Sequence, residues 1–187
     1  ARHDLATAQP FFEEALRRTP DGPDRQATLL NLARLHVIQA NDSRALALLD
    51  EADALFNAID CGNALAERGG LYRLRQDTAR ARPILKRALA ALGPDNSGAS
   101  AVLFDLALLD LAERKWHAAA ENLDRSEAVM RRTLPEHHLA FAILDFHRAR
   151  LALGRHRFAQ ARDLIARALP AIEAGFPPDH PERLGAR

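Results

Sequence analysis

The stretch LPEHHLAFAILDFH, residues 134–147, is where the sequence comes closest to a set of side chains that could do chemistry. It places three of the chain's eight histidines, His137, His138 and His147, close to Glu136. Imidazole and carboxylate groups are common zinc ligands and common general acids and bases. The stretch therefore raises two chemical hypotheses, a metal site and an acid–base pair, beside a purely structural role.

Spacing argues against a metal site formed by the stretch alone. His138 and His147 are separated by about 13 Å along a predicted helix, at a rise of about 1.5 Å per residue. Zinc holds its ligands within about 2.3 Å, so these two histidines cannot bind one ion. His137 could still join a histidine from a neighbouring part of the chain, which keeps a metal- or small-ligand-responsive sensor as an alternative.

A proline followed by an acidic residue recurs along the chain, and the histidine stretch begins with such a pair. The phrases are TPDGPDRQA from Thr19, LGPDNSGASA from Leu92, LPEHHLA from Leu134 and FPPDHPERLGA from Phe176. Proline ends a helix, and an acid can then accept from the unpaired N–H groups of the next one. We interpret the phrases as linkers, in which Glu136 takes the capping place of Asp179.

No further catalytic or phosphate-binding pattern stands in the sequence. The motifs G-x-x-x-x-G-K-[ST], H-E-x-x-H, C-x-x-C and G-x-S-x-G do not occur. Cys61 is the only cysteine, which excludes an intrachain disulfide and is compatible with a reducing compartment. We therefore predict a cytoplasmic protein that is not an enzyme and uses no cofactor or metal.

Composition excludes two classes of partner. The formal net charge is only +1 over 187 residues, so no global field attracts nucleic acid or an anionic membrane. No uncharged apolar run approaches the ~20 residues of a membrane-spanning helix. Hydrophobic residues make up 48% of the chain, which is enough for a substantial core. Protein or peptide partners remain the class to consider.

An internal repeat organises the chain. Small residues recur at intervals of 36 to 42 residues, each followed four positions later by a bulky residue and seven later by a second small residue. Offsets of four and seven return to one helical face. The first small residues are Ala8, Ala45, Ala81, Ala119 and Ala161, and the second are Ala15, Ala52, Ala88, Ser126 and Ala168.

A second periodic segment precedes four of these helices and carries its own small residue, at Ala33, Gly69, Ala107 and Ala149. The unit is therefore a helix, a short polar turn and a second helix. We predict an all-α chain of about nine helices. It begins with an unpaired helix at 4–18, continues with repeats over 24–57, 60–92, 97–132 and 136–175, and starts a further helix at 179–187.

This unit resembles the tetratricopeptide repeat (TPR), and its longer periods resemble the kinesin-light-chain-like subfamily. The small-residue skeleton matches, whereas the consensus aromatic residues are mostly replaced. Tyr72 survives, leucines take the tryptophan place, and Trp116 falls in a turn. The resemblance covers nearly the whole chain and implies a single right-handed α-solenoid over 1–187, with the first helix of each repeat on the concave face.

The resemblance also implies where a partner binds. In the first helix of each repeat, the binding positions lie three residues before, one after and four after the small residue, together with positions beside them. The predicted partner-binding residues are Leu30, Asn31, Arg34, Val37, Arg73, Phe104, Asp105, Leu108, Phe146, His147 and Arg150. Such a groove is apolar with arginines, which suits an acidic or amphipathic peptide. The alternative is that Leu30, Leu108 and Phe146 pack against the next repeat.

The function that follows from these features is a non-catalytic protein–protein interaction scaffold. The repeat style and the Ala- and Arg-rich composition resemble regulatory regions of large bacterial signalling proteins, and the unpaired first helix suggests a piece of a longer protein. Two alternatives stay open besides the scaffold. One is the histidine-based sensor, and the other is self-association through apolar helix faces at an exposed edge of the array.

Overall fold

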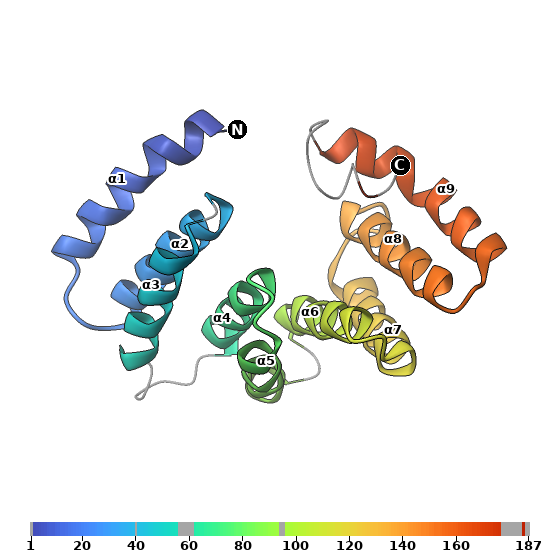
Figure 1. Cartoon of the computed structure of the whole chain (residues 1–187), viewed down its shortest axis with the longest axis horizontal. Coiled ribbons are helices and arrows are strands. Elements are labelled where there is room, and N and C mark those ends of the chain that lie inside the picture. The colour runs from blue at the N-terminus through green and yellow to red at the C-terminus, as the bar shows by residue number, and fades with distance from the viewer. Residues whose placement is uncertain (1, 40, 56–61, 94–95, 177–184, 186–187) are drawn as a thin grey trace. The chain divides into compact units, whose positions relative to one another are not determined.

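The computed structural model describes residues 2–39, 41–55, 62–93, 96–176 and 185. Within these residues the chain forms nine α-helices and no β-strand (Figure 1), which confirms the all-α prediction. Two compact units, residues 1–92 and 93–187, make up the chain and are described separately. Most of the further helix predicted at 179–187 lies outside the described residues.

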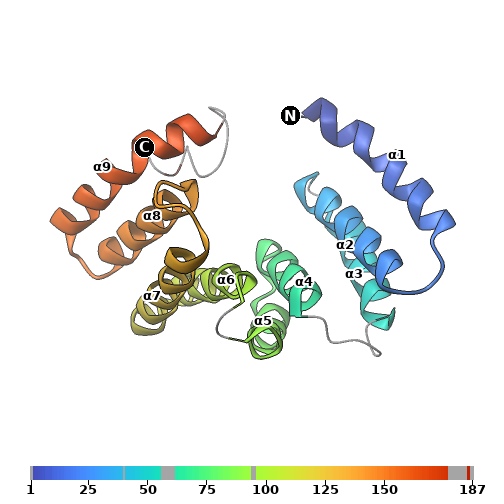
Figure 2. The ribbon, with the colours of Figure 1, turned by 180° about the vertical axis from the view of Figure 1, so that it is seen from behind.

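The first unit contains a lone helix followed by two helix pairs, which Figure 2 shows from behind. Its elements are α1 (Arg2–Arg18), α2 (Pro23–Ile38), α3 (Asp42–Leu55), α4 (Gly62–Leu74) and α5 (Thr78–Leu92). Arg25 joins three of them, because its guanidinium donates to the Leu16 carbonyl oxygen at 2.7 Å and to Glu51 at 2.8 Å. Long-range contacts of this kind tie the unpaired α1 to the first repeat.

The second unit contains two helix pairs. They are α6 (Gly98–Ala112) with α7 (Trp116–Thr133) and α8 (Leu139–Gly154) with α9 (Phe158–Gly175). None of the described helices has the length and apolar character that a membrane crossing requires.

The core lies between the helices of each pair, where the sequence placed its small residues. The members of this set are at most 1% exposed: Ala33, Ala45, Ala52, Ala81, Ala88, Ala107, Ala119, Ser126, Ala149, Ala161 and Ala168. Small side chains let two helices approach closely, and the bulky residues Leu49, Leu85 and Leu123 fill the remaining space without any exposure. Ala8 and Ala15 on α1 are only half-buried, because among the described helices it is α2 that packs against α1.

The turns inside the helix pairs all close with the same backbone hydrogen bond. The amide N–H three residues beyond the end of the first helix donates back five residues, as in Asp77 to Tyr72 at 2.9 Å and Arg157 to Ala152 at 2.8 Å. This is the Schellman arrangement, which places the intervening residue in the left-handed region. Gln76, Arg114 and His156 occupy that place with φ of 60°, 59° and 59°. The short turns therefore depend on a conformation that favours glycine.

Trp116, which the sequence placed in a turn, is the first residue of α7 and packs against the end of α8. A Cβ atom at Gly154 would lie 2.6 Å from its indole ring, so only glycine leaves room for this contact. Arg155 then donates to the Trp116 carbonyl oxygen at 2.7 Å. One aromatic side chain and one guanidinium thus join the two repeats of the second unit.

The left-handed turn residues generate a stability prediction. Replacing His156 by glycine should raise the free energy of unfolding by about 0.5 to 1 kcal/mol, because the cost of a non-glycine residue at φ 59° exceeds the added entropy of the unfolded chain. His156→Val at the same position should lower it, since a β-branched side chain tolerates this conformation least. Chemical denaturation measures both, and a destabilised His156→Gly would contradict the turn geometry.

Candidate partner-binding site

The histidine stretch divides into a linker and a helix. Helix α8 begins at Leu139, and His138 is its N-cap, with Nδ1 accepting the Ala140 amide hydrogen at 3.2 Å. Glu136, expected to make this cap, is exposed and lies two residues before it. The linker interpretation holds, but the capping residue was predicted wrongly, because a turn closed by His138 N–H to the Pro135 oxygen at 3.0 Å delays the helix start.

His147 lies in the interior of the second unit. Its ring makes edge-to-face contacts with Phe104 and Phe146, at centroid distances of 5.0 and 5.1 Å, and Arg150 Nη1 lies 3.1 Å from its Nδ1. Among the described residues no three His, Cys, Asp or Glu side chains come together as a metal site. His137 and His138 are exposed, so the three histidines of the stretch do not converge.

The predicted binding residues of the first unit lie in different environments. Leu30 is buried at 6% exposure and Asn31 is exposed. Arg34 is exposed and forms an ion pair with Glu67 of α4, so an acid of the same unit already balances its charge. Arg73 is half-buried and has an interaction partner. The side chain of Val37 falls outside the described part of the chain.

The predicted binding residues of the second unit lie on α6 and α8. Phe104, Asp105 and Leu108 are half-buried on α6, and Arg150 is exposed on α8. Phe146 is 6% exposed, packs with Ile172, and is also covered by Gly185, whose added Cβ would lie 3.2 Å from its ring. Phe104 and Arg150 therefore remain accessible, whereas Phe146 and His147 support them from beneath.

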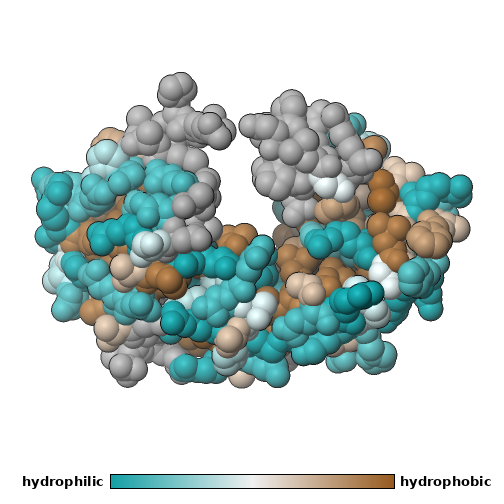
Figure 3. Space-filling view, in the orientation of Figure 1, coloured by the Kyte–Doolittle hydropathy of each residue, from teal (hydrophilic) through white to brown (hydrophobic). Residues whose placement is uncertain are grey.

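An apolar pocket of about 220 Å³ opens beside Phe104, between α6, the end of α7 and the start of α8. Figure 3 shows a brown, apolar area over α6 and α8 that teal residues border. The pocket is lined by Ser100, Ala101, Phe104, Ser126, Met130, Leu134, Ala140 and Ile143. Only Phe104 among these was predicted to bind a partner.

The missed residues come from three helices and a linker, which explains why the sequence did not reveal them together. Ala101 and Ile143 stand three residues before Phe104 and Phe146, on the same helical faces, so periodicity alone could have found them. Met130 belongs to the second helix of the repeat and Leu134 to the linker after it. The rule used to predict binding residues covers positions on the first helix alone, so it could not include them. Their place in the pocket depends on how α8 packs on α7.

Ser126 sets the floor of this pocket. It replaces the alanine of the other repeats and is fully buried, with its hydroxyl donating to the Ser100 carbonyl oxygen at 2.9 Å. The hydroxyl also lies 3.7 Å from the Met130 sulfur. A satisfied hydroxyl is tolerated in an apolar site, so the substitution keeps the repeat intact.

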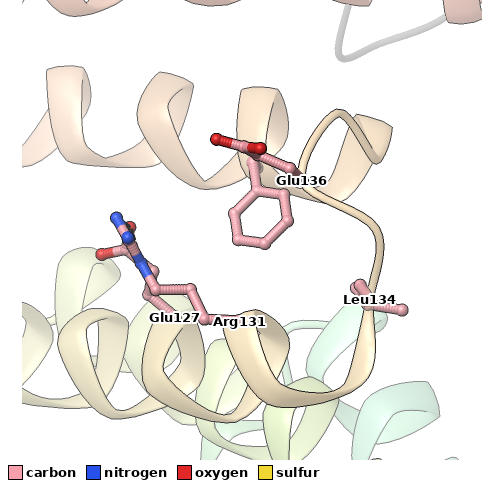
Figure 4. A pocket seen from close by; sticks show the side chains of 5 residues that line it. Glu127, Arg131, Leu134 and Glu136 are labelled. Atoms are coloured by element: carbon pink, nitrogen blue, oxygen red, sulfur yellow. Dashed lines mark hydrogen bonds and ion pairs between the residues drawn. The ribbon is translucent and has the colours of Figure 1, made fainter.

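A second cavity, of about 480 Å³, adjoins the first through the shared residue Leu134. Figure 4 shows Glu127 and Arg131 side by side on α7 and Glu136 across from them on the segment leading to α8. Glu127 accepts from Arg131 at 2.6 Å and from Arg148 of α8 at 2.6 Å. This ion-pair network joins the two repeats beside the apolar pocket.

The network lowers the pKa of Glu127. Burial acts in the opposite direction and would raise the pKa, but hydrogen bonds and charge from Arg148 and Arg131 outweigh it. The folded state therefore favours the carboxylate of Glu127, and its contribution to stability is present only while that carboxylate is ionised.

No protein-family model and no curated protein matches the sequence. Solved structures match its fold. A Podosopora anserina protein assigned as a kinesin light chain, with nearly identical TPR-like repeats, gives a TM-score of 0.67 at 19% identity over 89% of this chain and 84% of its own. A variant of it gives 0.69 at 17% identity, covering 93% and 89%. BtubC (BKLC) from P. vanneervenii gives 0.72 at 17%, covering 95% and 77%.

Identities this low show the fold alone, and the fold is a TPR-like repeat array of the kind found in kinesin light chains. The helix-turn-helix repeat class predicted from the sequence is therefore confirmed. The binding residues carried over from the resemblance are not tested by these matches and stay predictions.

The Glu127 network generates a pH prediction. At pH 7, Glu127→Gln should lower the free energy of unfolding by about 1 to 3 kcal/mol, because Arg148 loses a charged partner in a half-buried site. The pKa of Glu127 is lower in the folded than in the unfolded state, so this advantage exists above the unfolded pKa and disappears as pH falls through the folded one.

Urea denaturation at pH 7 and pH 3 measures the effect. The difference between the wild type and Glu127→Gln should shrink toward pH 3. Glu121→Gln, an exposed change on the same helix, should alter stability little at either pH. A difference between wild type and Glu127→Gln that is constant over this range would show that the ion pairs do not govern the junction.

Proposed function

We propose that the chain is a non-catalytic protein-interaction module, and that its second unit binds a partner peptide along α6 and α8. The observation that carries this is the apolar pocket beside Phe104, on a repeat fold whose packed helices leave extended faces for partners. At about 220 Å³ the pocket is smaller than the ~300 to 1,000 Å³ of small-molecule sites. One large apolar side chain of a peptide suits it as an anchor.

Arg150 supplies the second element of recognition. It is exposed on α8 and has no acidic partner among the described residues. Ile143 at the pocket and Arg150 are seven residues apart, so they share a helical face and lie about 10.5 Å apart along the axis. An extended peptide advances about 3.4 Å per residue, which puts an acid three residues from the anchor. We therefore expect a motif of the form apolar-x-x-Asp/Glu.

The arginines of the first unit support this recognition less. Arg34 already pairs with Glu67, and a partner's acid would have to displace that carboxylate. A surface ion pair contributes only about 0 to 1 kcal/mol, so displacing it would add little affinity.

A regulatory role within a larger bacterial signalling protein and a cytoplasmic location remain predictions from the sequence. Self-association and a histidine-based sensor also remain sequence hypotheses. The sensor finds little support in the second unit, where His147 is buried against Phe104 while His137 is exposed.

Selection from a displayed library of random 12-residue peptides tests the proposal, with affinities then measured by fluorescence anisotropy. We expect enrichment of apolar-x-x-acid sequences. Ala101→Trp should weaken the selected peptides at least tenfold, because the indole fills the pocket that the anchor occupies. Ala112→Trp, an exposed alanine on the same helix outside the pocket, is the matched control and should leave affinity unchanged.

Arg150→Glu should weaken acid-bearing peptides several-fold and should not weaken the same peptides carrying Gln in place of the acid. Equal enrichment on Ala101→Trp and on the wild type would refute the pocket as the binding site.

A further inference from the structure

A third cavity, of about 190 Å³, lies in the second unit between α7, the end of α8 and the start of α9. It shares no residue with the apolar pocket. Its polar lining residues are Arg148, Arg155, Arg157, Gln160 and Asp124, and its apolar ones are Ala120, Leu151, Ala152 and Leu164.

The arginines that line this cavity differ in whether an acidic side chain already balances their charge. Arg148 is compensated, because Asp124 and Glu127 accept from it at 2.5 and 2.6 Å. Arg155 donates to a neutral group, the Trp116 carbonyl oxygen, and has no acidic partner in the described part of the chain. Arg157 is exposed and forms no ion pair with any described residue. Two positive charges at the cavity are therefore left without a counterion from the described chain.

The start of α9 borders the same cavity, where Arg157 and Gln160 line it. Arg157 is the N-cap of this 18-residue helix, and its side chain provides no capping hydrogen bond. Gln160, in the first turn, lines the cavity and contributes a side-chain amide. Guanidinium groups and a side-chain amide are donors that oxyanions bind.

We infer that this cavity is an oxyanion-binding site, which takes a carboxylate or phosphate group borne by a side chain of a protein partner. Arg155 and Arg157 supply the charge, and the side-chain amide of Gln160 supplies a further donor. The site goes beyond the apolar pocket and works independently of it, because Arg157 lies outside that pocket and the two cavities have no lining residue in common.

Nitrogen-15 NMR of the chain, titrated with inorganic phosphate or with acetate at constant ionic strength, tests this inference. The amide signals of the lining residues Arg155, Arg157 and Gln160 should shift and saturate. Arg157→Gln should weaken binding about tenfold, the effect of losing one charged hydrogen-bonding partner. Arg162→Gln, on the same helix but outside the cavity and 80% exposed, should stay within about twofold of the wild type.

The two probes distinguish the source of the group. Saturable binding of phosphate alone would indicate that the partner bears a phosphorylated side chain. Saturable binding of both phosphate and acetate would show that a carboxylate side chain is sufficient for binding. Gln160→Leu is a second variant, for the case that Arg157→Gln disturbs the start of the helix. It should also weaken binding. Shifts that grow linearly without saturation, or that match between wild type and both variants, would overturn the site. Both variants should still bind peptides at the apolar pocket, so a failure of the oxyanion-site proposal can be distinguished from a failure of the proposed function.

Discussion

The close approach of two helices at small residues is the constraint on which the rest of this structure depends. In the second unit, Ala107 with Ala119 and Ala149 with Ala161 are almost fully buried, which lets each pair approach at the short distance of well-packed helices. The left-handed turn at Arg114 and at His156 then reverses the chain within a few residues. Each pair is thereby a rigid block whose outer faces must be covered by a neighbour, or remain open to a partner.

The junction between the two blocks creates the surfaces on which function is proposed. Trp116 packs on Gly154 at one end, and the Glu127–Arg148 ion pairs join α7 to α8 along their length. At the other end of the junction, α8 begins late, at Leu139, because the linker closes its own turn first. The apolar pocket lies at that delayed start, and the cationic cavity lies at the opposite end of α8, where it turns into α9. One junction thus offers two chemically different sites.

Sequence periodicity predicted the fold because it reports which side of a helix is buried. The small residues at Ala119 and Ala161 identified the repeats without reference to any contact. The site was less predictable, since it depends on contacts between elements distant in sequence. No spacing rule indicates that Glu67 balances Arg34, or that Met130 lines a pocket with residues of α6 and α8. Such pairings follow from how the repeats pack, which the pattern of a single repeat does not contain.

The chain has a single methionine, Met130, and its side chain lines the apolar pocket. Its methyl group therefore gives one unambiguous carbon-13 NMR signal that reports on that pocket. On titration with a selected apolar-x-x-acid peptide, this signal should shift and saturate with the affinity measured by anisotropy. A peptide that binds with that affinity and leaves the Met130 methyl signal unchanged would contradict the account, because its anchor would lie elsewhere on the chain.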